Sequence, residues 1–212
     1  GDVLVVTQKV VSKAEGRMVT LDAIEPSALA NQISEGHRRD PRHTELILRE
    51  SRRIVRMDRG NIISETHHGF NCANAGIDAS NIPGSNIVCL LPIDSDASAR
   101  RIRQTVKDRT GSLVAVIISD TFGRPFRNGQ IDVAIGISGI HPLFNYKGSK
   151  DSFHKNINFT SIAIADELAS SAELVLGKIN NNPIALIRGV NFKISSKNSK
   201  LLIMPKNKSM FS

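Results

Sequence analysis

The sequence predicts an α+β fold with mixed, largely antiparallel sheets and packed helices. Short aliphatic runs bounded by turn residues occur beside segments whose apolar residues recur at helical spacing. These two kinds of segment do not alternate in the regular strand–helix–strand order of a doubly wound sheet. The chain is 212 residues long and 40% hydrophobic, which is enough to build a core without staples. This composition excludes a disordered chain, a collagen and a coiled coil.

Strands are predicted where aliphatic runs lie between turn residues. The pair Val10 and Val11 is expected to continue the first strand or to pair with it. The run at 113–118 is unbroken and aliphatic, as expected of a strand that is buried on both faces. In chain order, the predicted strands are 3–6, 61–63, 87–91, 113–118, 134–140 and 183–187.

Helices are predicted at 26–33, from Asp40-Pro41 onward, after Asp94 or Asp96, and at 162–176. Asp40 can cap free N–H groups, and proline suits the first helical position. The third helix has one apolar stripe, made by Ala99, Ile102 and Val106.

The charge and cysteine content limit the possible partners and the cellular compartment. Lys and Arg number 28 against 20 Asp and Glu, so the net charge of +8 indicates an anionic partner. Cys72 and Cys89 lack metal-site spacing and are expected to be small, buried and reduced. No membrane-length apolar run or signal peptide is found, which favours a cytoplasmic protein that does not bind a membrane. Because the chain starts inside a strand without Met, a preceding segment is expected.

Three polar, glycine-containing stretches are the candidate sites, at 74–81, 119–132 and 177–183. The first offers Asp78 to a hard cation and Asn81 to a ligand, although a surface loop with Asx turns explains it as well. The third reads as a helix end at Gly177, and Lys178 beside it is a weaker candidate for meeting an anion.

The stretch at 119–132 follows the buried strand directly. Asp120 and Thr121 are hard oxygen ligands of the kind that Mg²⁺ and Mn²⁺ accept. Arg124 and Arg127 carry planar guanidinium groups that match phosphate or carboxylate. The alternative is a polar turn in which Asp120 pairs with Arg124.

Seven segments carry a family resemblance. The chain resembles the coenzyme F420:L-glutamate ligase family, also called gamma-glutamyl ligases, collinearly over nearly its whole length. The stretches NAGIDASN at 74–81, within the matching segment 68–81, and SDTFGRPFRNGQIDVAIG at 119–136 are the most specific. The other segments lie at 1–17, 40–56, 90–103, 165–178 and 182–189.

The resemblance implies a function. The family joins L-glutamate through an amide bond to the lactyl carboxylate of the deazaflavin precursor F420-0, and some members add further glutamates through gamma linkages. GTP supplies the energy, two Mg²⁺ or Mn²⁺ ions assist, and K⁺ stimulates. The implied assembly is an intertwined homodimer, and the implied domain is the ligase domain over 1–212, with a C-terminal arm at 191–212 and an absent N-terminal segment.

The resemblance also assigns residues. Metal binding falls on Asp78, Asp120 and Thr121. Nucleotide contacts fall on Gln8, Lys9, Lys13, Asn81, Gly177 and Lys178, where some members have a metal-binding Glu in place of the last. The expected catalytic groups are Arg124 and Arg127, which stabilise phosphoryl or hold acidic substrates, and Asp132, which orients an arginine or accepts a proton.

Two other functions compete with the ligase. A metal-dependent GTP phosphohydrolase would use the same aspartates without an amine acceptor. A basic RNA-binding module would explain the net charge and the Lys-rich tail. Against RNA binding, aromatic residues make up only 4% of the chain and no RNA-recognition motif is found, so no nucleic-acid partner is expected.

Overall fold

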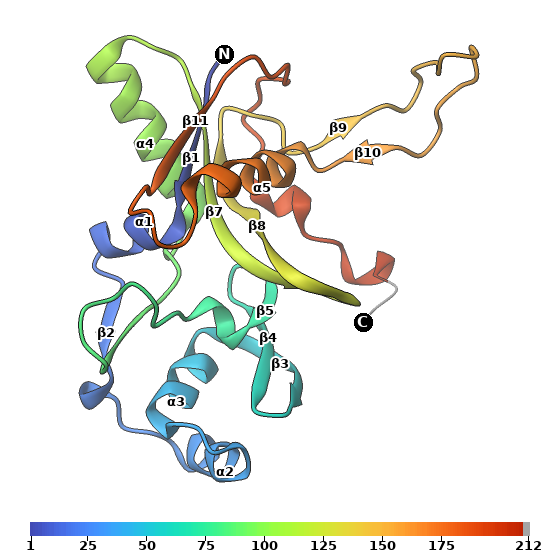
Figure 1. Ribbon diagram of the computed structural model, residues 1–212. Helices are drawn as coiled ribbons and strands as arrows, with labels where there is room; N and C mark the ends of the chain where they lie inside the picture. The colour runs from blue at the N-terminus through green and yellow to red at the C-terminus, as the bar shows by residue number, and fades with distance from the viewer. Residues whose placement is uncertain (210–212) are drawn as a thin grey trace. The chain divides into compact units, whose positions relative to one another are not determined.

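The computed structural model describes residues 1–209, so the predicted C-terminal arm is described only as far as 209 (Figure 1). The chain forms two compact units, each with a hydrophobic core. Unit 1 contains residues 1–7, 94–121 and 131 onward, and unit 2 contains residues 8–93 and 122–130.

Unit 1 is built on a four-stranded sheet in the order β11-β1-β7-β8. Strand β1 runs antiparallel to β11, with Val5 opposite Ala185, and parallel to β7, with Val5 opposite Ile117. The aliphatic residues of β7 and the valines of β1 are buried, as expected of strands covered on both faces, and Leu4 is partly buried. The bounds are β1 (Val3–Thr7), β7 (Ala115–Arg124), β8 (Arg127–Ser138) and β11 (Ile184–Ile187).

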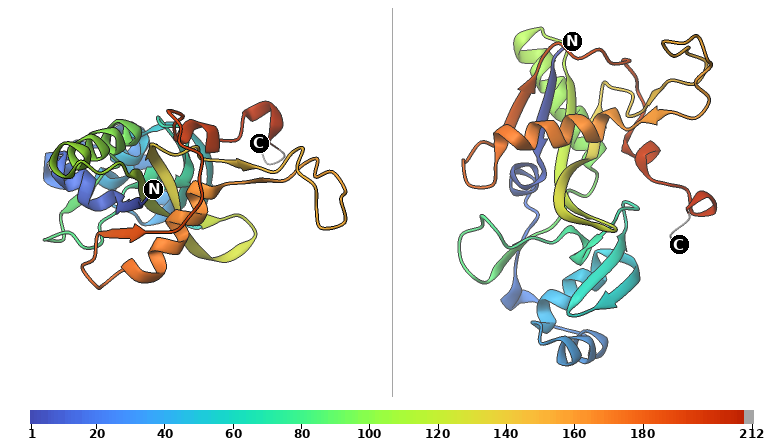
Figure 2. Two further views of the ribbon diagram at one scale, coloured as in Figure 1. Left: turned by 90° about the horizontal axis from the view of Figure 1, so that it is seen from above. Right: turned by 45° about the vertical axis from the view of Figure 1, so that its right-hand side comes forward.

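Two helices cover this sheet, α4 (Ser95–Thr110) and α5 (Ile164–Leu176). Seen from above, they lie on opposite sides of β1 (Figure 2, left). The buried stripe of α5 packs into the core of the sheet. On the α4 side, a Cβ at Gly136 would lie 2.4 Å from the Ser95 backbone, so glycine lets this helix approach closely. Asp94 caps α4 by accepting a hydrogen bond from the Ala97 N–H.

The rest of unit 1 is an arm and a tail. The arm runs out from β9 (Phe144–Asn145) and returns through β10 (Ser161–Ile162), extending away from the sheet (Figure 1). The tail includes η3 (Ser199–Leu202) and η4 (Lys206–Lys208).

Unit 2 packs helices against a three-stranded antiparallel sheet in the order β3-β4-β5 and a two-stranded sheet of β2 and β6. As predicted, α3 begins at Pro41 and Asp40 accepts a hydrogen bond from the Arg42 N–H. The bounds are α1 (Gln8–Ala14), β2 (Met18–Thr20), η1 (Leu21–Ala23), α2 (Ala28–His37), α3 (Pro41–Arg49), β3 (Ser51–Asp58), β4 (Asn61–Thr66), β5 (Asn71–Ala73), η2 (Asn74–Gly76) and β6 (Ile87–Cys89).

The α+β class is confirmed, and three local predictions are corrected. Val10 and Val11 lie in α1 rather than in a strand, and only Val11 of the two is buried. The stretch at 119–132 is mostly strand rather than a polar turn, because β7 continues to Arg124 and β8 begins at Arg127. Leu113 is exposed and precedes β7, since the pairing with β1 begins at Ala115.

Two predictions from composition can be checked directly. Cys72 and Cys89 are buried and form no disulfide, as expected. Within residues 1–209, no helix is both long and apolar enough to span a membrane.

Candidate active site

The predicted site residues fall into both units. Lys9, Lys13, Asp78 and their neighbours belong to unit 2, whereas the residues around Asp132 and Lys178 belong to unit 1. Each group is built by its own unit.

In unit 2, the Lys9 ammonium reaches the 78–80 loop from the first turn of α1. Its Nζ donates to Asp78 Oδ2 at 2.5 Å, and to the carbonyl and hydroxyl oxygens of Ser80 at 2.8 Å each. The Ser80 N–H and hydroxyl in turn donate to the two Asp78 oxygens, at 2.6 and 2.9 Å. This is the expected Asx turn, with a lysine as an additional anchor.

The backbone around Asp78 is fixed on both sides. Asp78 and Cys89 exchange two backbone hydrogen bonds, of 3.1 and 2.8 Å, which tie the loop to β6. Upstream, Gly76 has a φ of +72° and a Cβ there would lie 2.9 Å from the Leu91 side chain. Glycine is therefore required at this position for both its conformation and its size.

The Asp78 carboxyl is held in its charged form. Partial burial acts to raise its pKa, but the hydrogen bonds and charge of Lys9 and the two donors of Ser80 outweigh this effect. The net pKa lies below the ordinary aspartate value. A carboxylate that is ionised at neutral pH suits the predicted role in holding a cation.

The other unit 2 candidates differ in accessibility. Gln8 is buried, and its Nε2 donates to Ser12 Oγ at 2.7 Å and to Leu90 O at 3.1 Å. Lys13 is exposed, and its Nζ donates to the Asn81 carbonyl at 2.8 Å. The Lys13 side chain is therefore placed to meet a ligand of the Asn81 loop, whereas that of Gln8 is occupied in the interior.

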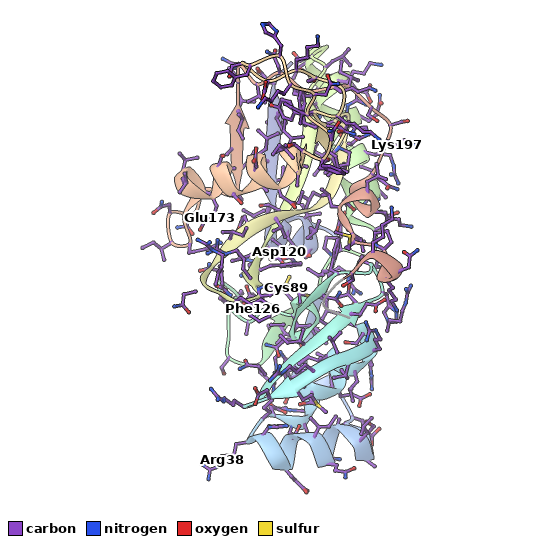
Figure 3. The ribbon with its side chains drawn as sticks, turned by 90° about the vertical axis from the view of Figure 1, so that its right-hand side faces the viewer. Arg38, Cys89, Asp120, Phe126, Glu173 and Lys197 are labelled. Atoms are coloured by element: carbon purple, nitrogen blue, oxygen red, sulfur yellow. The ribbon has the colours of Figure 1, made fainter. Side chains whose placement is uncertain are left out.

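Arg124 and Arg127 lie at the tip of the β7–β8 hairpin, in the segment that belongs to unit 2. Arg124 donates to the Asn128 carbonyl at 2.8 Å, while its Nε is buried without a hydrogen-bond partner among residues 1–209. Arg127 is exposed, and Phe126 between them is almost fully exposed, with a φ of +61° (Figure 3).

In unit 1, the buried Asp132 is the centre of a polar cluster that reaches the surface at Lys178. Its Oδ2 accepts the Ser119 hydroxyl at 2.9 Å, and its Oδ1 accepts the Thr121 hydroxyl at 2.6 Å. The Lys178 ammonium donates to Thr121 Oγ1 at 2.5 Å and to Asp132 Oδ1 at 3.1 Å. Asp132 thus has two hydroxyls and an ammonium as its side-chain partners within residues 1–209, rather than an arginine.

The elements explain how Lys178 reaches this cluster. Helix α5 ends at Gly177, whose φ is +60°, and a Cβ there would lie 2.6 Å from Asn180 Nδ2. The chain turns at this glycine, and Lys178 also lies 3.5 Å from Glu173 Oε1 in the last turn of α5. Asp120 is half-buried on β7, between Ser119 and Thr121 (Figure 3).

Sequence reasoning missed Ser80, Ser119 and Glu173. The signal for Ser80 was its position two residues after Asp78, where an Asx turn closes. Ser119 stands two residues before Thr121 on the same strand, so their side chains share a face. Glu173 had no local signal, because its contact with Lys178 depends on the turn at Gly177.

The donor atoms fit hard divalent cations. Each unit supplies carboxylate and hydroxyl oxygens, from Asp78 and Ser80 in unit 2 and from Asp120 and Thr121 in unit 1. Within residues 1–209, no three His, Cys, Asp or Glu side chains gather at metal-binding distance. Mg²⁺ in enzymes is commonly held by one or two carboxylates together with substrate phosphates rather than by a full protein cage, so these sparse donor sets are compatible with it.

Comparison with known proteins shows which family the chain resembles. The profile of the family described as F420-0:Gamma-glutamyl ligase matches residues 1–189. The coenzyme F420:L-glutamate ligase of Methanothermobacter thermautotrophicus is 46% identical over 190 residues, covering 89% of this chain and 75% of the relative. That of Methanocaldococcus jannaschii is 42% identical over 212 residues, covering 100% and 84%. That of Methanopyrus kandleri is 46% identical over 191 residues, covering 90% and 75%.

The two polar clusters are built on the stretches that carried the resemblance, at 74–81 and 119–136. With a profile match over most of the chain and relatives at this level of identity, this protein belongs to the F420-0:gamma-glutamyl ligase family.

Proposed function

We propose that this protein joins L-glutamate through an amide bond to the lactyl carboxylate of F420-0, a step in coenzyme F420 biosynthesis, at the expense of GTP. The single observation that carries the proposal is the family match over residues 1–189, which includes both polar clusters. The clusters add a chemical reason, because each unit presents lysine ammonium groups beside carboxylate and hydroxyl oxygens.

Amide formation needs an activated acid, because a carboxylate has no good leaving group. In the proposed reaction, a carboxylate oxygen of F420-0 attacks the γ-phosphorus of GTP, the bond to the β-phosphate oxygen breaks, and GDP leaves. The glutamate amine then attacks the acyl carbon, phosphate leaves, and the amine loses a proton. Such phosphoryl transfer depends mainly on positioning and charge stabilisation.

The chain's own residues supply these two effects. Lys13 and Lys178 are exposed ammonium groups that can bind phosphate oxygens. Asp132 fixes Thr121 and Lys178 through hydrogen bonds, which gives it a positioning role. Arg124 and Arg127 are proposed to hold anionic substrate groups with their planar guanidinium forks.

Two Mg²⁺ or Mn²⁺ ions, when bound, would neutralise developing charge on the transferring phosphoryl group. Asp78 would hold one ion, and Asp120 with Thr121 the other. K⁺ remains a proposed activator. A cytoplasmic setting, where GTP is available, also belongs to the proposal.

A homodimer is proposed as the assembly. The β9–β10 arm carries large aromatic side chains on its surface, and Phe153 and Phe159 are 80% and 96% exposed. Tyr146 packs on Phe144 near the base of the arm, with ring centroids 4.8 Å apart. Apolar exposure on an extended arm is typical of a segment that a second copy covers.

Light scattering after size-exclusion chromatography tests the assembly. We expect the natural chain to be dimeric and the double variant Phe153→Ser/Phe159→Ser to be largely monomeric. The matched control is Leu174→Ser on the exposed face of α5, which should stay dimeric. A monomeric natural chain would overturn this part of the proposal.

Mass spectrometry tests the reaction. Incubation with F420-0, L-glutamate, GTP and Mn²⁺ should add the mass of one or more glutamyl groups to the precursor. Release of phosphate without that addition would indicate a GTP phosphohydrolase instead. Retention of single-stranded RNA without either reaction would indicate a nucleic-acid-binding module.

A further inference from the structure

A second polar site lies in unit 1, on the α4 side of the sheet. A pocket of about 240 Å³ opens between α4, the end of β8 and the C-terminal tail. Arg100, Arg103 and Gln104 line it from α4, Ser138 and Gly139 from β8 and the turn after it, and residues 195–197 from the tail.

The pocket carries three positive charges, from Arg100, Arg103 and Lys197, and none of its lining residues within 1–209 is acidic. Arg103 is held in place, because its Nε donates to the Val114 carbonyl at 2.9 Å. Gly139 makes room for this side chain, since a Cβ there would lie 2.5 Å from Arg103 Nε. Arg100 also forms an exposed ion pair of 3.7 Å with Asp94, which does not line the pocket. The three cations outnumber this one acidic neighbour, which favours an anionic ligand.

The tail wall of the pocket is anchored on both sides of residues 195–197. On one side, the Lys193 carbonyl accepts the His141 N–H at 2.8 Å. On the other, buried Asp96 accepts the Ser199 N–H at 3.0 Å and the Ser199 hydroxyl at 2.9 Å. Asp96 also accepts the Ile137 N–H at 2.8 Å, so one carboxylate joins the tail to β8. The backbone that carries Lys197 is thus held in place before any ligand arrives, which lowers the entropy cost of binding.

We propose that this pocket binds a multiply charged oxyanion of the phosphate class. Two guanidinium groups and one ammonium match a di- or trianion better than a single carboxylate, and guanidinium forks fit phosphate oxygens. Ser138, Ser195 and Ser196 add hydroxyl donors for the remaining oxygens.

The pocket is separate from the Asp132 cluster of the same unit. Asp132 and Ser138 both lie on β8, six positions apart, which corresponds to about 20 Å along a strand. Figure 3 shows the same separation, with Glu173 of the Asp132 side and Lys197 at opposite margins of unit 1. The inference therefore adds a site to the proposed ligase chemistry and does not depend on it.

Titration calorimetry with inorganic phosphate at low ionic strength tests the proposal. We expect saturable binding to the natural chain, and about tenfold or more weaker binding to the double variant Arg100→Gln/Lys197→Met, because two charged donors are lost. The control is Arg109→Gln, which removes a charge from the same helix without lining the pocket. Its affinity should change by less than about twofold.

Two further arms make the outcome decisive. Amide NMR shifts on phosphate addition should concentrate at Ser138, Gly139 and Ser196. Comparing GMP with inorganic phosphate shows whether the pocket takes a free ion or a phosphate group attached to a larger molecule. Binding of either one that depends on Arg100 and Lys197 supports the site. Absence of saturable binding in a folded natural chain, equal weakening by the Arg109 control, or binding of RNA alone would overturn it.

Discussion

Each unit contains a lysine–aspartate pair beside a hydroxyl. The lysine is the more buried partner in unit 2, and the aspartate is the more buried partner in unit 1. In unit 2, the Lys9 side chain is 19% exposed and that of Asp78 is 41% exposed. In unit 1, the Lys178 side chain is 55% exposed and that of Asp132 is 4% exposed. The same two charges therefore present an anion to solvent in one unit and a cation in the other.

This difference separates fixed groups from exchangeable ones. A buried charge is costly to leave unpaired, so the buried member holds its place and its partners. The exposed member can exchange its protein partner for a ligand at little cost, because water compensates it. On this reasoning, Asp78 is offered to a cation and Lys178 to an anion, while Lys9 and Asp132 position them.

The largest expected effect is on stability, from Asp132→Asn. The variant removes the charge that accepts the Ser119 and Thr121 hydroxyls and faces Lys178. We expect the free energy of unfolding to fall by about 3 kcal/mol, because the buried hydrogen bond from Ser119 and the partly buried one from Thr121 to the carboxylate are both weakened. Urea denaturation measures it. If Lys178→Met destabilises the protein more than Asp132→Asn does, the assignment of the fixed partner is wrong.

Asp78→Asn should affect activity more than stability, although the less exposed Lys9 ammonium loses its counter-charge. The side chain keeps its volume but loses the charge that the proposed metal needs, so we expect glutamylation to fall about 100-fold or more. The control is Asp58→Asn, an exposed acid of the same unit that should keep its activity. Steady-state assays at several Mn²⁺ concentrations measure both. Full activity of Asp78→Asn at low Mn²⁺ would contradict the role of Asp78 in offering an anion.

Lys178→Met tests the opposite case. We expect the KM for GTP to rise about tenfold, as one charge-assisted contact to phosphate is lost. The free energy of unfolding should fall by less than in Asp132→Asn, because the Ser119 and Thr121 hydroxyls still bind the buried Asp132 carboxylate. The control is Lys107→Met, which removes the same charge from an exposed position of α4 and should change neither quantity. An unchanged KM would show that Lys178 only neutralises Asp132.

The smallest expected effect is on the free energy of unfolding, from the ion pair of Glu45 and Arg49, which has no predicted chemical role. Glu45 accepts the Ser27 N–H and the Arg49 guanidinium, and these bonds lower its pKa to about 2. Because the folded pKa is depressed, the stabilisation is complete above the ordinary glutamate value and is lost as pH falls through about 2. Glu45→Gln should lower the free energy of unfolding by about 1 kcal/mol at pH 7.

The gap between Glu45→Gln and the natural chain should close as pH falls from the ordinary glutamate range toward about 2. Thermal unfolding across this range measures it, and glutamylation at pH 7 should be unchanged. A stability difference between the two chains that is constant with pH would mean that the charge of Glu45 contributes nothing. Glu45 could then not serve as a structural ion pair with which to compare Asp132.

Local sequence signals predicted most elements of the fold. The caps at Asp40 and Asp94 and the helix end at Gly177 were readable, because each depends on residues within one turn. The prediction failed at 10–11, where two β-branched residues favour a strand by propensity. The burial of one face of α1 overrode that preference.

The sequence by itself determined the family, the fold class and the two polar stretches, since all of these depend on motifs and local periodicity. Only the tertiary structure decided which partner of each pair is buried, because exposure depends on packing between distant segments. Lys9 and Asp78 are 69 residues apart, and Lys178 and Asp132 are 46 apart. No pattern in the sequence shows which partner of each pair is buried. That partner positions the other, and the exposed partner is the one that can bind a ligand.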